Sequence, residues 1–193
     1  MEYISHMEIG DPFAKNELIA NFNKANKDVS TYFSSVALTQ FFTAPVNRWS
    51  PAANLDHLIK SITPVSIALR LPTFLLAILF GKATVGSKRI GQIKQIYLGK
   101  LAEGAKASRA FTPKSDNNPS DPAKSKDFLL AKWDKATEKL MLSFSEWNEN
   151  DLETIRLPHP ILGKLTVREM MLFTLYHYSH HTNNVEKLLS EKP

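Results

Sequence analysis

The sequence predicts an all-α protein built as a four-helix bundle, and three observations lead to this fold class. Apolar residues recur at steps of three and four along four long segments, which is the period of one helix face. No convincing run of alternating apolar and polar residues indicates a strand. Residues that favour helix starts and ends stand at the borders of the four segments. Four amphipathic helices around a common core satisfy all three.

The first two helices are expected over about 13–42 and from Ser50 onward. In the first, one apolar stripe runs from Leu18 to Val36, and Pro45 ends the helix because proline cannot continue the hydrogen-bond ladder. In the second, Ser50 is a favoured N-cap and Pro51 is favoured at the first helical position. Its apolar stripe comprises Leu55, Ile59, Ile62 and Leu69.

The third and fourth helices are expected over about 122–147 and 166–190. Apolar residues step by three or four from Leu129 to Trp147. The fourth helix has the better defined start, since Thr166 and Glu169 have the spacing of a capping box.

Between the second and third helices lies a long segment, about 70–121. The most apolar stretch of the chain, Pro64 to Phe80, leads into it, but it is shorter than the roughly 20 residues that span a bilayer. Arg70 and Pro72 also interrupt it, so no transmembrane segment is expected. Residues 74–80 are expected to form a short buried helix, with insertion into a membrane interface as the alternative.

The rest of this segment is predicted to hold one more short helix, around 90–102. It is followed by a loop over 115–122, where serine, asparagine and proline gather.

Length and composition indicate one domain, residues 1–193, and the absence of cysteine is compatible with a reducing compartment without proving it. The chain has 193 residues and no cysteine, which excludes a disulfide framework, a cysteine zinc site and a thiolate nucleophile of its own. The first residues lack the basic start and apolar run of a secretory signal peptide. We therefore expect a cytoplasmic protein.

The charge is uneven along the chain. The net charge is +5, yet residues 81–132 alone hold eleven Lys and Arg against four Asp and Glu. Such a segment is either a solvated lysine-rich region or a patch that attracts an anion, a nucleic acid or a membrane surface. No nucleic-acid-binding motif accompanies it, and no nucleic-acid partner is expected.

Three of the six histidines lie on the predicted fourth helix. At 100° per residue, His177 and His181 fall one turn apart at the middle of the apolar stripe, whereas His180 falls toward its edge. Two imidazoles at positions i and i+4 on a buried face can converge on one cation, as in helical zinc sites. A hydrogen-bonded or surface histidine cluster is the alternative.

A third ligand has to come from another helix, and His57 in the second helix is the natural candidate. Its position lies away from the apolar stripe of that helix. It shares a face with Ala53, Pro64 and Ala68, which is either exposed or a small-residue seam that lets another helix approach closely.

Two motifs resemble those of the DinB/YfiT-like superfamily. The first is Trp49–Leu58, WSPAANLDHL, and the second is Leu157–Thr166, LPHPILGKLT, followed by the histidines of the fourth helix. The resemblance implies an up-down four-helix bundle of DinB/YfiT-like type. It does not cover the segment 70–121, which is then a long helical and loop insertion between the second and third helices.

The resemblance also implies a site and a chemistry. The metal triad of the family falls on His57, His177 and His181, and the ion would be divalent zinc, nickel or iron. Characterised branches transfer low-molecular-weight thiols such as bacillithiol, mycothiol or glutathione, or isomerise their adducts, and homodimers occur in the family. Many members follow the last ligand with Arg-Gly-Gln, where this chain has Thr182-Asn183-Asn184.

Three hypotheses about function follow. The first is a metal-dependent enzyme acting on a small-molecule substrate, by thiol transfer or by hydrolysis. The second is a non-catalytic bundle whose metal or histidine cluster is structural and whose surface binds a partner. The third is a membrane or nucleic-acid binder that uses residues 81–132. The further candidates for residues around the metal or the pocket are His180, Thr174, Tyr178, Asn184 and His159.

Overall fold

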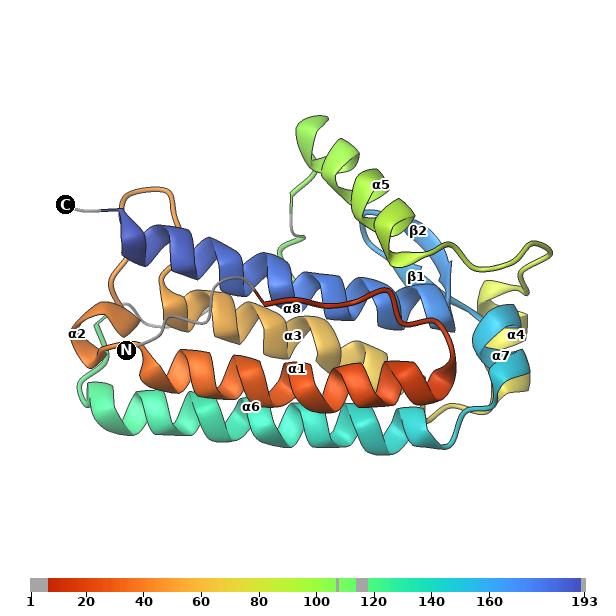
Figure 1. The fold of residues 1–193 in the computed structure, drawn as a ribbon, viewed down its shortest axis with the longest axis horizontal. Coiled ribbons are helices and arrows are strands. Elements are labelled where there is room, and N and C mark those ends of the chain that lie inside the picture. The colour runs from red at the N-terminus through yellow and green to blue at the C-terminus, as the bar shows by residue number, and fades with distance from the viewer. Residues whose placement is uncertain (1–6, 107, 114–117, 192–193) are drawn as a thin grey trace.

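The computed structural model describes residues 7–106, 108–113 and 118–191, and its centre is the expected helical bundle (Figure 1). Helices α1 and α3 each contact both α6 and α8, so the four helices surround one core. Helices α1 and α8 run in one direction and α3 and α6 in the other. The four helices are α1 (Lys15–Ser35), α3 (Pro51–Ala68), α6 (Pro122–Ser145) and α8 (Val167–Ser190).

A long connection explains why α3 and α6 are parallel. It contains α4 (Thr73–Phe80) and α5 (Ile90–Ala102), and it returns the chain to the end of the bundle where α3 began. Helix α5 was expected at these residues, and it packs on α8. Part of the loop expected over 115–122 lies outside the described residues.

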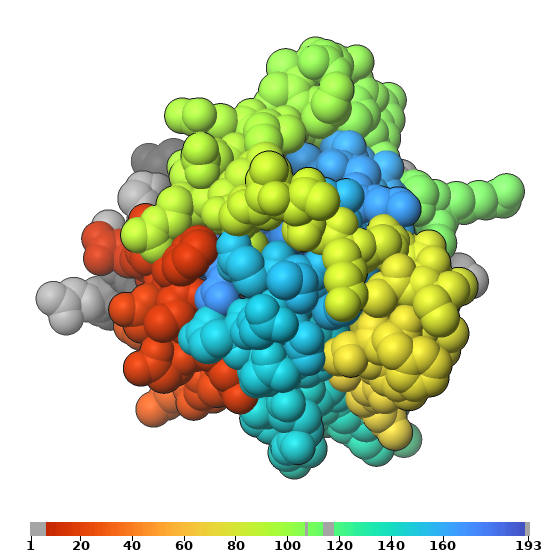
Figure 2. All heavy atoms as spheres, turned by 90° about the vertical axis from the view of Figure 1, so that its right-hand side faces the viewer, coloured from red at the N-terminus to blue at the C-terminus, as the bar shows by residue number. Residues whose placement is uncertain are grey.

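Helix α4 forms where expected, but the prediction that it is buried is wrong. Only Leu76 of this helix is buried, while Phe74 and Ile78 are 67% and 75% exposed. The helix lies across the end of the bundle beside α7 (Glu149–Thr154), so only one side of it is covered (Figure 2). Within the described residues, no single helix is long and apolar enough to cross a membrane. Helices α3 and α4 together have the length and composition of a membrane span, but the chain bends by 110° between them.

The first predicted helix is two helices. Helix α1 ends at Ser35, and α2 (Leu38–Phe41) follows after two residues of extended backbone. The ammonium of Lys126 donates hydrogen bonds to the carbonyls of Ser34 and Val36, at 2.7 and 2.6 Å. These bonds replace helical ones lost at the break. The apolar stripe continues through the break, so the periodicity of the sequence does not reveal that the helix ends there.

A short β-hairpin precedes α8 and was not predicted. Strands β1 (Arg156–His159) and β2 (Gly163–Thr166) pair antiparallel, with Leu157 opposite Leu165 and both buried. Gly163 has a φ of +76°, which glycine adopts without strain. Strands of four residues contain too few alternations to stand out in a sequence.

The start of α8 is held as the sequence predicts. The Oγ1 atom of Thr166 accepts a hydrogen bond from the amide of Glu169 at 3.1 Å, and the Glu169 carboxylate accepts from the amide of Thr166 at 3.0 Å. This capping box fixes where α8 begins and therefore where its histidines lie along the bundle.

Replacing the cap tests this role. We expect Thr166→Ala to lower the free energy of unfolding by about 1 kcal/mol, because a first-turn amide loses its acceptor. Thr166→Ser keeps the hydroxyl and should lose much less. Urea denaturation of both variants measures the difference, and equal losses would contradict the capping role.

Candidate metal centre and adjoining cavity

Helices α3 and α8 bring three buried imidazoles together. The Nε2 atom of His177 lies 3.2 Å from Nε2 of His57 and 3.0 Å from Nε2 of His181. Each of the three residues is only 5–6% exposed. His57 therefore lies in a buried seam against α8, which settles the two alternatives that its position in the sequence left open.

Hydrogen bonds on the far side of two rings decide their tautomers. The carbonyl of Phe111 lies 2.7 Å from Nδ1 of His57, and a carbonyl can only accept, so this nitrogen carries the proton. The amide of Asn54 donates to the carbonyls of Trp49 and Ser50, which turns its oxygen toward Nδ1 of His181, at 2.7 Å. Both rings thus present an unprotonated Nε2 to the third.

This donor set fits a divalent cation. Two nitrogens bound to a tetrahedral zinc at about 2.1 Å lie about 3.4 Å apart, close to the distances found. A single proton on Nε2 of His177 can satisfy only one of its two neighbours well, whereas a cation satisfies all three nitrogens. The three histidines are a group that could hold a metal ion, and their ligand atoms lie within 4.8 Å of one another.

Burial keeps the cluster neutral. It lowers the pKa of His57, and it lowers the pKa values of His177 and His181 well below the ordinary value. Repulsion between the histidines themselves acts in the same direction on the α8 pair. Neutral imidazole is the form that binds metals. Trp49 covers the cluster, with its ring stacked 5.9 Å from that of His181.

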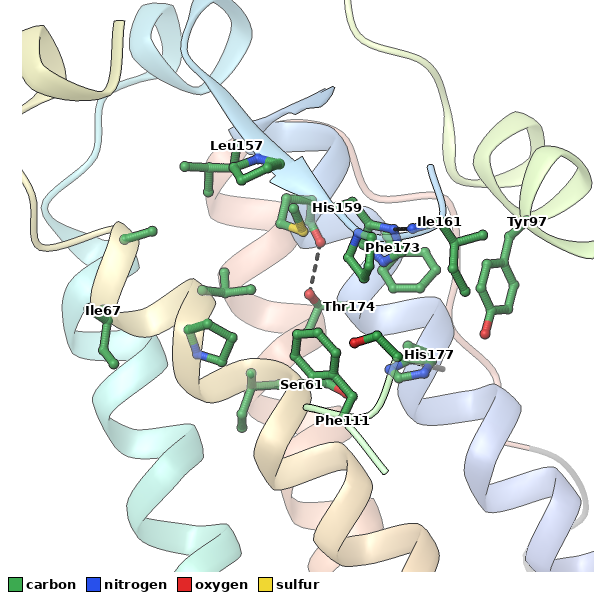
Figure 3. A pocket seen from close by; sticks show the side chains of 18 of the residues that line it. Ser61, Ile67, Tyr97, Phe111, Leu157, His159, Ile161, Phe173, Thr174 and His177 are labelled. Carbon is green, nitrogen blue, oxygen red and sulfur yellow. Dashed lines mark hydrogen bonds between the residues drawn. The ribbon is translucent and has the colours of Figure 1, made fainter. Parts of the chain in front are cut away.

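A cavity of about 430 Å³ adjoins two of the three histidines, His57 and His177 (Figure 3). Its walls come from α3, the β-hairpin, the first half of α8, Tyr97 of α5 and Phe111 of the long connection. The cluster therefore has a side that faces a partly open cavity of a size suited to a small molecule.

His159, one of the sequence candidates, lines this cavity. Its Nδ1 atom accepts hydrogen bonds from the amides of Ile161 and Leu162, at 3.2 and 3.0 Å. Those bonds require the neutral ring with its proton on Nε2. Burial lowers the pKa of His159 to about 4, in agreement with that form.

The other candidates lie in different places. Thr174 lines the cavity, but its hydroxyl donates to the carbonyl of Met170. His180 and Asn184 contact each other at a separate surface pocket and do not join the cluster. Tyr178 is fully buried in the core, where its ring meets that of Trp133, and it does not line the cavity.

Three residues of the site were missed from the sequence. Asn54 lies three residues before His57, so the helical period places it on the same side of α3 and offers a signal. Phe111 and Tyr97 belong to the long connection, and no pattern in the sequence predicts that they reach the histidines.

The sequence and the fold both resemble those of known proteins. The model of the DinB superfamily matches residues 21–185. The chain belongs to the DinB superfamily. Among curated proteins, none matches it significantly.

Two solved structures share the DinB fold with this chain. YfiT from Bacillus subtilis, described as "a probable metal-dependent hydrolase with an unusual four-helix bundle topology", aligns at a TM-score of 0.59 and 14% identity, over 96% of this chain and 93% of its own. The colibactin self-resistance protein ClbS, solved with a dsDNA, aligns at a TM-score of 0.50 and 14% identity, over 94% of this chain and 99% of its own.

The second neighbour corrects one expectation. The sequence led us to expect no nucleic-acid partner, but ClbS combines this fold with a bound duplex. That expectation is therefore wrong as a general exclusion. Several basic residues of the long connection are engaged within the chain, since Lys88 pairs with Glu169 and Arg89 with Asp11.

The buried histidines predict how stability depends on pH. Below pH 6.5 the unfolded chain takes up protons at histidines that the folded chain keeps neutral, so metal-free protein should lose stability as the pH falls from 6.5 toward 5. Each such histidine contributes a slope of up to about 1.4 kcal/mol per pH unit. His159→Gln should lower this slope by the contribution of one histidine, up to about 1.4 kcal/mol per pH unit.

Urea unfolding at pH 7.5, 6.5, 5.5 and 5.0 with chelator present measures this dependence. The window lies above the range in which most carboxylates titrate. A free energy of unfolding that does not change between pH 6.5 and 5 would contradict the prediction.

Proposed function

We propose that this protein is a metal-dependent enzyme in which His57, His177 and His181 hold a divalent ion and a small molecule binds in the adjoining cavity. The observation that carries the proposal is that Nε2 of His177 lies 3.2 and 3.0 Å from Nε2 of His57 and of His181, which Phe111 and Asn54 hold unprotonated. Three histidine ligands suit zinc, nickel or iron.

The chain's own residues decide how such a site is used. His57 and His177 border the cavity, whereas His181 lies behind them against Asn54 and Trp49. With three protein ligands, a divalent ion keeps open positions, and its chemistry is to acidify a nucleophile and to polarise a carbonyl. Because two of the three histidines border the cavity, a molecule bound there would reach the ion, and this favours catalysis over a closed structural site.

We propose hydrolysis as the reaction. No Lys, Arg, Asp or Glu occurs among the described residues that line the cavity, so the carboxylates and amines of a peptide-like thiol would find no charged partner there. Water needs no such partner. The description of YfiT as a probable metal-dependent hydrolase agrees with this choice.

Thiol transfer is the second candidate, favoured by the two sequence motifs. Since the chain has no cysteine, the thiolate would have to come from a substrate. The single domain of residues 1–193 and the cytoplasmic location stay predictions.

Metal analysis tests the ligand set. Protein purified without chelator should contain about one divalent ion per chain, and His177→Ala should lose most of it because one of three ligands is gone. His180→Ala is the matched control, since this histidine belongs to the same helix but not to the cluster, and it should keep the ion. Undiminished metal in His177→Ala would overturn the proposal.

Variants of Asn54, whose side-chain amide orients His181, test the same site through metal affinity. Asn54→Leu should weaken metal binding by about 10- to 100-fold, because His181 loses the acceptor that fixes its tautomer. Asn54→Asp keeps an acceptor and should bind far more tightly than the leucine variant. Competition with a fluorescent chelator measures both affinities, and circular dichroism checks that both variants fold.

Two assays separate the reactions. Hydrolysis predicts that neutral aryl esters such as 2-naphthyl acetate are cleaved by the metal-loaded protein and not by His177→Ala. Thiol transfer predicts adducts of glutathione or bacillithiol with an electrophile such as monochlorobimane, detected by mass spectrometry. Adducts formed without any ester cleavage would favour the second candidate.

A further inference from the structure

We infer that the cavity takes an uncharged, largely apolar substrate with one hydrogen-bond acceptor, and that the hydroxyl of Tyr97 donates to that acceptor beside His177. This inference deepens the proposed function and rests on it for the reaction, but the binding that it describes requires no metal.

The described residues that line the cavity include no charged side chain. They are mainly aliphatic, proline and aromatic, and the histidines among them are neutral. A charged group moved from water into such a space without a partner costs several kcal/mol or more. The volume of about 430 Å³ lies in the range that holds small organic ligands.

Three polar side chains of the walls, those of Ser61, Thr174 and His159, are already bonded to the protein, and Ser108, which also lines the cavity, is an exposed residue. The hydroxyl of Ser61 donates to the carbonyl of His57 at 2.8 Å, and that of Thr174 donates to the carbonyl of Met170 at 2.8 Å. Nδ1 of His159 accepts from two amides. Because these three groups form their main hydrogen bonds within the protein, they offer little to a polar ligand, and the walls favour an apolar one.

Tyr97 differs from them. The residue is 6% exposed, and its ring is held edge-on against Phe173, with centroids 5.1 Å apart, and against His177, with centroids 6.4 Å apart. No described residue forms a hydrogen bond with its hydroxyl, which extends from α5 toward His177 (Figure 3). Burial raises the pKa of Tyr97 to about 12, so the group remains a donor at neutral pH.

A donor at that place would orient a substrate. A carbonyl or ether oxygen that accepts from Tyr97 lies on the same side of the cavity as His177, while the apolar part of the molecule fills the space toward Ile67 and Leu157. The reacting group is then held next to the histidine cluster.

Three probes that share one skeleton test the inference on metal-free protein at pH 7.5. They are 2-acetylnaphthalene, which is neutral with an acceptor, 2-ethylnaphthalene, which is neutral without one, and 2-naphthoate, which is an anion. Equilibrium dialysis should show the acetyl compound binding at least tenfold more tightly than the naphthoate. Equal affinities for these two would overturn the uncharged-substrate assignment.

Two tyrosine variants isolate the donor. Tyr97→Phe should weaken 2-acetylnaphthalene about fivefold, the value of one neutral hydrogen bond, and leave 2-ethylnaphthalene unchanged. Tyr176→Phe is the control, because Tyr176 neighbours Tyr97 but does not line the cavity, and it should change neither. A Tyr97→Phe variant that binds the acetyl compound as the parent does, or that loses both probes equally, would overturn the donor role.

A charge placed at the mouth gives an independent check. Ile67 lines the cavity and is 57% exposed, so Ile67→Lys should fold and should shift the preference toward the naphthoate. An unchanged preference would contradict the position of the binding site. Because no ion is present, failure of these experiments leaves the metal analysis untouched, and loss of the metal proposal leaves these measurements valid.

Discussion

The rest of the site depends on one constraint, which is that three buried imidazoles on two helices point the same ring nitrogen at one another. Neutral acceptors at 3.0–3.2 Å repel unless a proton or a cation lies between them. Asn54 and Phe111 remove the protons that could otherwise relieve the contact at His57 and His181. A proton on Nε2 of His177 would satisfy only one of the two contacts well, so the geometry favours a cation at the point between α3 and α8 where the three nitrogens meet.

The four-helix bundle and the long connection between α3 and α6 contribute different parts of the site. The bundle supplies the three histidines from rigid helices, which holds ligand positions closely. The connection supplies the carbonyl of Phe111 and the ring of Tyr97, so it orients one ligand and shapes the cavity. Lys60 helps to hold this segment, since its ammonium donates to the carbonyl of Thr112 at 2.9 Å. A change in the connection can therefore alter the shape of the cavity while the three histidines stay the same.

One fold can carry different functions, as YfiT, described as "a probable metal-dependent hydrolase", and ClbS, solved with a bound dsDNA, illustrate. The function of this chain therefore depends on its own site and not on its fold alone. The site of this chain combines three close histidines, an uncharged cavity beside them and a tyrosine hydroxyl that no described residue engages.

The sequence by itself determined the four helices, the cap at Thr166 and the pairing of His177 with His181, because these depend on the local period of a helix and on contacts within one turn. Its motifs also pointed to His57. Only the tertiary structure decided that His57 is buried, that α1 breaks at Val36 and that α4 is exposed. It alone placed Phe111 and Tyr97 beside α8. Those features depend on which distant segment covers a given face, and a periodic pattern carries no record of that partner.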